Sequence, residues 1–411
     1  MTTVAEPPPA APTGPARDTV RAYARRWLTD VKSGDLGSLP IIVGLVIIAI
    51  VFQTQNDRFL TASNFVNLIV QTAPYAVIAM GVTFALLLGE IDLSIGFVSG
   101  VGGVLVALLL APDGNELPTA VALVVALAAG IGIGVLHGLI ITKVGVPSFV
   151  VTLAGLLAWN GVVLLLIGSQ GTVILQNEFV IGLANDFMEP AVAWILMLAC
   201  VGLYAAIQLV RYRSRDKAGL ANDPIVIIAL RVAGLAVVLA VVVAVANEDR
   251  GVPYSGILVA ALLLGLTFLL NRTRFGRHVY AVGGNAEAAR RAGIDVDRVK
   301  IACFALCSLL AVLGGIILAS RLRSVDTNTG GGQALLYPIA AAVIGGTSLF
   351  GGRGTMKAAL LGAIVMISID NGLGLLGLSS GTKFVLTGGV LLLAVTVDSI
   401  SRRGRAQSGR A

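Results

Sequence analysis

The feature that most constrains this chain is a series of long apolar runs. Twelve of them, rich in Val, Leu, Ala and Ile, lie near residues 40–53, 64–89, 95–110, 119–141, 147–168, 190–210, 225–246, 254–270, 299–320, 335–350, 356–376 and 382–398. A helix needs roughly 20 apolar residues to cross about 30 Å of hydrocarbon, whereas a membrane barrel would show alternating segments of about ten residues. The sequence therefore predicts an all-α, polytopic integral membrane protein with about ten to twelve transmembrane helices.

The composition excludes a soluble enzyme. Only 12% of the 411 residues are charged and 56% are hydrophobic, whereas soluble domains carry about 25% charged residues. The three cysteines and two histidines form no metal-ligand spacing, so we expect no metal site and interpret Cys200, Cys303 and Cys307 as packing residues. The first twenty residues lack the apolar core of a cleaved signal peptide.

The distribution of basic residues predicts the orientation in the membrane. If the N-terminus is cytoplasmic, 23 of the 29 Lys and Arg residues fall in cytoplasmic segments, and only Arg58, Arg250, Arg321 and Arg323 fall in outer ones. Short cytoplasmic loops carry such an excess of basic residues, so we expect both termini in the cytoplasm. A basic face toward anionic lipid explains the net charge of +7 without any nucleic-acid partner.

Three regions follow from this reading. Residues 1–38 form a Pro-rich cytoplasmic leader with a basic amphipathic segment, residues 39–400 the transmembrane domain, and residues 401–411 a basic cytoplasmic tail. The spacing of apolar residues from Asp18 to Val31 is typical of a short helix. It fits a helix on the membrane surface or an ordinary solvated one.

Two apolar runs are irregular. The run at 335–350 is short and contains Gly345 and Gly346, so it either crosses or forms a re-entrant or broken helix. The run at 64–89 is long and leads into GEIDLSIG, which indicates a steep tilt or a helix break within the bilayer. Glu90, Asp92 and Ser94 mark this structural break, and the carboxylates of Glu90 and Asp92 either cap the exposed amides of the next helix or serve a function as acids at membrane depth.

Polar residues inside apolar runs are the candidates for a solute pathway. Acidic groups at membrane depth are costly and point to function, and this chain has few of them. That scarcity argues against an ion-coupled carrier, which needs a carboxylate-lined ion site. The candidate pathway residues, each of which would otherwise tie helices together, are Gln71, Tyr75, Asn160, Asp370 and Asn371.

Glycine patterns in the chain indicate packing and not nucleotide binding. Gly130, Gly134 and Gly138 recur every four residues in an apolar run, which predicts a close helix contact on one face. The segment GGRGTMK lacks the spacing of a P-loop. We therefore expect no ATP site in this chain.

The segment 271–300 is the most basic predicted loop and has its own structural signals. Asn285 follows two glycines and precedes AEAARRAG, a pattern typical of an N-cap followed by a short helix that ends at Gly293. A structured helix between two spans suits a docking element for another protein. An inert solvated or lipid-facing loop is the alternative.

Four segments carry a family resemblance. VGGNAEAARRAGI resembles the cytoplasmic coupling loop of the ribose/xylose-type ABC importer permeases. GEIDLSIG, AAAVIGGTSLFGGRGT and IDNGLGLLG resemble further segments of that family, in the same order. With similar hydropathy, the resemblance covers about residues 40–400.

The resemblance implies the permease subunit of an ATP-driven monosaccharide importer, for a pentose such as xylose. Such a subunit is no enzyme and binds no cofactor; it works as a homodimer in the lipid of a bacterial cytoplasmic membrane, with an extracytoplasmic sugar-binding protein and ABC ATPases that carry ATP and Mg²⁺. The ATPases would dock on Gly284, Asn285, Glu287, Ala288, Ala289, Arg290 and Gly293. The alternatives are an ion-coupled secondary transporter of a small polar solute and a membrane-embedded transferase.

Overall fold

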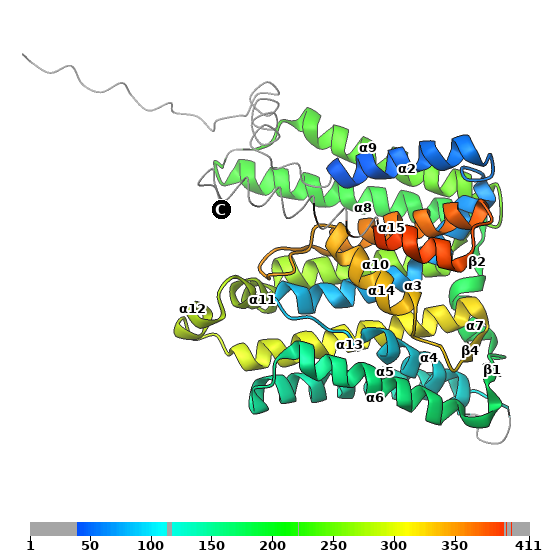
Figure 1. Cartoon of the computed structure of the whole chain (residues 1–411). Helices are drawn as coiled ribbons and strands as arrows, with labels where there is room; N and C mark the ends of the chain where they lie inside the picture. Colours follow the sequence, from blue (N-terminus) through cyan, green and yellow to red (C-terminus); the bar gives the residue numbers. More distant parts are fainter. Residues whose placement is uncertain (1–38, 113–116, 221, 390–391, 393–395, 397–411) are drawn as a thin grey trace, which may run out of the picture. The chain divides into compact units, whose positions relative to one another are not determined.

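The structure is a computed structural model that describes residues 39–389 except 113–116 and 221, together with residues 392 and 396. The predicted leader 1–38, with its Asp18–Val31 segment, and the tail 401–411 lie outside the described residues. The described chain is almost entirely helical (Figure 1), which confirms the predicted all-α class.

Eight helices in the described part of the chain are long and apolar enough to span a membrane, which confirms a polytopic membrane protein. They are α3 (Ala62–Leu87), α5 (Thr119–Leu139), α6 (Ser148–Ile167), α8 (Pro190–Lys217), α9 (Ile225–Asn247), α10 (Tyr254–Arg272), α13 (Val296–Leu322) and α15 (Met356–Leu375). Shorter apolar helices are α2 (Leu39–Gln55), α4 (Ile95–Leu109) and α14 (Gln333–Ile344). Residues 380–389, at the start of the last predicted run, are helical too.

Short elements connect these helices. They comprise α7 (Glu178–Asn185), α11 (Arg274–Gly284), α12 (Ala286–Arg291), a π-helical turn (Ile140–Val144) and a 3₁₀ turn (Gly168–Gln170). Strand β1 (Thr172–Ile174) pairs antiparallel with β4 (Ser324–Asp326), and β2 (Phe187–Met188) pairs antiparallel with β3 (Val252–Pro253). Figure 1 shows α12 at one end of the helix bundle and β1, β4 and α7 at the other; we call these the α12 end and the β4 end.

The chain divides into two compact units. Helices α8 and α9 form one unit, which spans residues 189–247 in the described chain, and the remaining described elements form the other. Within the first unit the two helices pack against each other and bury almost none of their residues. Asp223 and Arg231 form an ion pair at 2.9 Å near the start of α9.

Helix α13 is the centre of the larger unit, where it packs against α3, α4 and α5. A Cβ added at Gly315 would overlap the carbonyl oxygen of Ser99 in α4, and one at Gly314 would lie 2.8 Å from the oxygen of Pro74 in α3. Small residues let membrane helices approach this closely. Gly130, Gly134 and Gly138 of α5 all face α13, which confirms the contact predicted from their spacing.

Two non-helical segments of the larger unit contact each other. Helix α3 runs without interruption from Ala62 to Leu87 and so covers nearly all of the long run, and residues 88–94 then lead without helix to α4. After α14, residues 345–355 return to the α12 end, where the Gly352 amide donates to the Leu87 carbonyl oxygen at 2.8 Å. The short run at 335–350 therefore crosses the bundle as half helix and half loop.

The contact of α5 with α13 yields a stability prediction. A Cβ at Gly134 would lie 2.6 Å from Ala305 Cα, whereas one at Gly132 in the same helix meets nothing within 4 Å. We expect Gly134→Ala to destabilise the detergent-solubilised protein by about 1–3 kcal/mol, the usual cost of overpacking. Thermal unfolding by circular dichroism measures this. The control Gly132→Ala should leave the midpoint unchanged or raise it, since alanine favours helix; equal midpoints for the two variants would contradict the assigned contact.

Candidate functional site

A polar pocket of about 400 Å³ opens at the β4 end of the larger unit. Helices α3 and α13 and the segment that joins β4 to α14 form its walls. Its lining residues are Tyr75, Leu318, Arg321, Leu322, Ser324, Asp326, Asn328, Thr329, Gly330, Gly331, Gln333 and Ala334. Cationic, anionic and amide side chains converge there on one cavity.

Turn geometry and glycines hold the pocket's floor. The Asp326 carboxylate accepts from the Asn328 amide at 2.9 Å and from the Thr329 hydroxyl at 3.1 Å, which closes a tight turn. The chain then approaches α4 so closely that a Cβ on Gly96 would lie 2.8 Å from Leu335 Cα. Gly330 has φ of +93°, a conformation that favours glycine. The floor is therefore fixed by backbone and local side-chain contacts.

Asp370 of α15 lies behind this floor and organises it. Its Oδ1 accepts from Gln333 Nε2 and from the Tyr337 hydroxyl, each at 3.0 Å. The Tyr337 ring packs on Tyr75 with 5.7 Å between centroids. Since Gln333 and Tyr75 both line the pocket, one carboxylate positions two of its side chains.

A second polar cluster joins α3 to α15. Asn64 Nδ2 donates to Asn371 Oδ1 at 3.0 Å, and Asn371 Nδ2 donates to Gln71 Oε1 at 3.3 Å. Together with the Asp370 cluster, it brings Gln71, Tyr75, Asp370 and Asn371 into one region of the unit. Asn160 is separate, because it lies on α6, which packs against α4 and α5.

Sequence reasoning missed most of the pocket's charged and polar residues, which are Arg321, Ser324, Asp326, Asn328, Thr329 and Gln333. Arg321 registered only as an outer charge, and Asp326 and Gln333 lie in a predicted loop. The signal that points to them is the run GGGQ at 330–333, since three adjacent glycines before an apolar run mark close backbone contacts.

The break after α3 is held by two different kinds of contact. Asp92 Oδ1 accepts from Ser94 N at 2.9 Å and from Ser94 Oγ at 2.6 Å, at the start of α4. Asp92 is 2% exposed, and its other oxygen lies 3.7 Å from Cys307 Sγ. Glu90 instead forms an ion pair with Lys300 of α13.

His137 lies in the same region but forms no metal site. Its Nε2 accepts from Trp159 Nε1 at 3.1 Å, and the side chain is 3% exposed. Among the described residues, no three His, Cys, Asp or Glu side chains are arranged to hold a metal ion.

At the α12 end, the predicted loop 271–300 is structured along its length. Asn285 Oδ1 accepts from Ala288 N at 2.9 Å and caps α12, and Gly293 follows the helix at φ of +83°, which confirms the predicted cap and stop. The preceding helix α11 was not predicted. Six of the seven proposed docking residues, all except Ala289, are exposed: Gly284, Asn285, Glu287, Ala288, Arg290 and Gly293.

Ala289 differs from its neighbours on α12. It is 4% exposed and packs into the core of the larger unit. Glu287 pairs with Arg290 at 3.4 Å and with Arg291 at 3.2 Å on the opposite, solvated side. Such exposed pairs contribute little to stability, so these charges are available to a partner.

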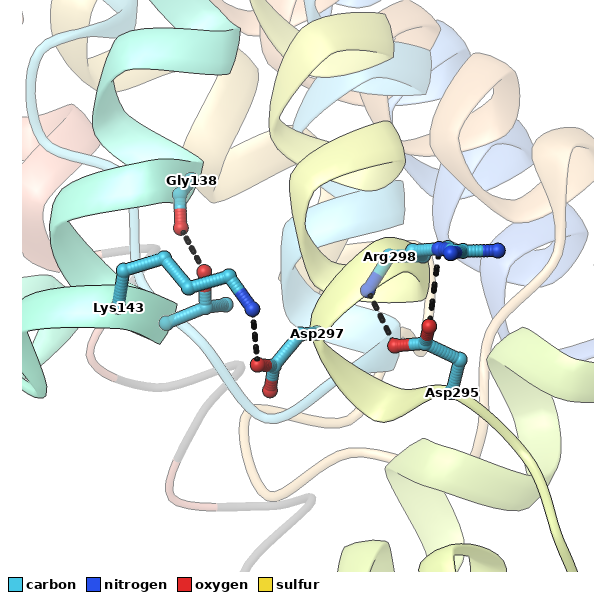
Figure 2. Close-up of polar contacts among 6 residues, drawn as sticks. Gly138, Lys143, Asp295, Asp297 and Arg298 are labelled. Atoms are coloured by element: carbon cyan, nitrogen blue, oxygen red, sulfur yellow. Dashed lines mark hydrogen bonds and ion pairs between the residues drawn. The ribbon is translucent and has the colours of Figure 1, made fainter.

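Ion pairs also fix the start of α13 at this end (Figure 2). Lys143 Nζ lies 2.8 Å from Asp297 Oδ2, which joins the end of the α5 segment to α13. Asp295 caps α13 by accepting from the Arg298 amide at 3.1 Å, and its Oδ2 lies 2.9 Å from Arg298 Nε. These contacts lie on the C-terminal side of α12, where they cap α13 and join its first turn to the α5 segment.

Comparisons with known proteins agree with this architecture. The family model described as "branched-chain amino acid transport system / permease component" matches residues 64–395. The xylose transport system permease protein of Escherichia coli (strain K12) is 37% identical over 377 residues, 91% of this chain and 94% of that protein. That of Haemophilus influenzae is 33% identical over 91% of this chain and 99% of its own length.

A ribose permease is similar as well. The ribose import permease protein of Escherichia coli (strain K12) is 32% identical over 379 residues, 92% of this chain and 96% of that protein. No solved structure matches this chain at a significant level. The chain therefore belongs to this permease family, as an ABC importer permease of the ribose/xylose type.

Proposed function

We propose that this chain is the membrane subunit of an ATP-driven importer that carries a monosaccharide, a pentose such as xylose, across a bacterial cytoplasmic membrane. The observation that carries the proposal is the polar pocket at the β4 end, backed by Asp370. Its volume of about 400 Å³ falls within the roughly 300–1,000 Å³ of small-molecule sites. Relatives named for xylose and ribose align over more than nine-tenths of the chain.

The pocket's chemistry suits a hydroxylated, uncharged solute. Each sugar hydroxyl both donates and accepts hydrogen bonds. Arg321 and Gln333 supply donors, Asp326 supplies acceptors, and the Tyr75 ring supplies an apolar surface. A transport pathway must also release its solute, so a wet, partly open pocket is preferable to a tight one.

Energy for transport would enter at the α12 end. In this proposal, ABC ATPases carrying ATP and Mg²⁺ dock on the exposed face of α12, and an extracytoplasmic sugar-binding protein delivers solute to the β4 end. Two copies of the chain would form the permease dimer within the lipid. Conformational coupling across the bundle would then link ATP hydrolysis to solute movement.

Reconstitution tests this function. The chain, its ATPase and its sugar-binding protein would be placed in lipid vesicles, and uptake of labelled pentoses and hexoses would be measured. We expect uptake that requires ATP and the binding protein and that persists with an ionophore. Uptake that proceeds without ATP and collapses with an ionophore would instead establish an ion-coupled secondary transporter.

Asp370 provides a test of the pathway. Asp370→Asn removes the negative charge that Gln333 and Tyr337 contact, and a hydrogen bond to a charged group contributes about 1.5–3 kcal/mol. We expect uptake at limiting solute to fall about tenfold or more, while ATPase co-purification stays normal. The exposed Asp223→Asn serves as the control. If the uptake kinetics of Asp370→Asn match those of the control, Asp370 only holds helices together and takes no part in the solute pathway.

Ala288 provides a test of docking. The side chain is exposed on α12, whereas the adjacent Ala289 is buried and would disturb folding if enlarged. We expect Ala288→Trp to abolish co-purification of the ATPase without changing the amount of protein in the membrane. The matched control is Ala218→Trp. Ala218 is an exposed alanine directly after α8, and the distribution of basic residues predicts that it lies on the same side of the membrane as α12. Normal ATPase recovery with Ala288→Trp would exclude this face as the docking surface.

A further inference from the structure

Three separate segments meet backbone to backbone beside α12. They are Leu87–Gly89 after α3, Gly283 in the last turn of α11, and Gly351–Gly352 in the loop after α14, and we call them the glycine junction. The Gly352 amide donates to the Leu87 carbonyl oxygen at 2.8 Å. A Cβ added at Gly283 would overlap that same oxygen and lie 2.8 Å from the Gly352 nitrogen. One added at Gly351 would lie 2.6 Å from the Gly283 oxygen.

One arm of the junction leads to the coupling helix. Gly283 is two residues before Asn285, the cap of α12. Tyr280 of α11 strengthens this arm, because its hydroxyl donates to the Gly354 carbonyl oxygen at 2.8 Å. Burial raises the pKa of Tyr280, so the phenol remains protonated and able to donate at neutral pH.

The other two arms lead to the pocket at the opposite end. Leu87 ends α3, which carries Tyr75, and the loop 345–355 follows α14, which begins at Gln333. Tyr75 and Gln333 both line the pocket. The junction is therefore the place where the segment bearing α12 touches both the end of α3 and the loop after α14, the two other elements that lead to the pocket.

The contact has mechanical properties that side-chain packing lacks. The atoms nearest to an added Cβ at Gly283 all belong to backbone, so no flexible side chain lies there to absorb a displacement of Gly283. Packed interiors have low compressibility and transmit strain. Glycines with positive φ lie within the two non-helical segments, at Gly89 (+75°) and Gly346 (+97°), where a hinge can bend.

We propose that the glycine junction transmits movement of the coupling helix α12 to α3 and α14 and so opens and closes the pocket at the β4 end. Gly283 is the positioning residue of this contact, since it has no side chain and its backbone meets the other two arms. The inference rests on the proposed function, because it assigns the route by which ATP hydrolysis reaches the solute pathway.

The test compares glycine substitutions in the assembled transporter. Gly283→Ala would be reconstituted with the ATPase and sugar-binding protein, and the number of ATP molecules hydrolysed per solute taken up would be measured. Coupling between sites typically corresponds to about 5–150-fold, and we expect this ratio to rise about tenfold while ATPase co-purification stays normal. Loss of co-purification would overturn the proposal, because the junction would then serve docking.

Two other glycines are controls for the substitution itself. Gly265 in α10 has no atom within 4 Å of an added Cβ, so Gly265→Ala should behave as the unmodified protein. Gly134 is crowded but lies at the contact of α5 with α13. Gly134→Ala should lower thermal stability and keep the normal ratio of ATP to solute. A ratio raised as much by Gly134→Ala as by Gly283→Ala would show general packing damage and overturn the inference.

Tyr280→Phe is a second variant that tests the same proposal if Gly283→Ala does not fold. It removes the hydroxyl that donates to Gly354 and keeps the ring. We expect a smaller rise in the ratio, of about two- to fivefold, because one hydrogen bond of the junction is lost. The unmodified system could take up sugar with ATP while Tyr280→Phe and every folded Gly283 variant show the same ratio of ATP hydrolysed to solute taken up. In that case the inference fails but the proposed function stands. If the unmodified system shows no ATP-driven uptake, the proposed function itself fails.

Discussion

The structure depends on one constraint: in hydrocarbon, every backbone N–H and C=O must find a partner within the protein. Helices satisfy it along most of the chain, and the two non-helical stretches at 88–94 and 345–355 need partners from elsewhere. The Thr152 hydroxyl donates to the Ile91 oxygen at 3.1 Å, and the Gly352 amide donates to the Leu87 oxygen. These contacts tie both stretches to the larger unit, whose helices α3 and α14 also lead to the pocket.

Much of this fold could be predicted from the sequence, because hydrocarbon thickness fixes the length of each apolar run. The cap at Asn285 and the stop at Gly293 follow from local chemistry and were predicted correctly. Helix α11 was missed because its charged residues read as loop, and α8 continues through the charged residues 211–217 that had been assigned to a loop. The strand pairs were missed because residues far apart in the chain form them.

For the candidate site, residue types in the sequence identified some of the polar residues, but the sequence did not show which of them lie close together in the fold. A carboxylate or amide in an apolar run identified Asp370 and Asn371, but nothing in the sequence shows that α15 packs against α3 while the helix of Asn160 does not. Arg321 became part of the pocket only through the fold of the segment after α13. Likewise, the burial of Ala289 depends on which side of α12 meets the bundle.

The pairing of β2 with β3 has a consequence for how this architecture can vary. The chain leaves the larger unit after Met188 and returns at Glu248, and Met188 is the strand partner of Val252, four residues after the return. The α8–α9 hairpin is therefore inserted between two points that are already fastened together. A helical hairpin crosses the membrane twice. Its gain or loss would therefore leave the orientation of every later helix in the membrane unchanged. An evolving permease can change its length at this position without inverting its topology.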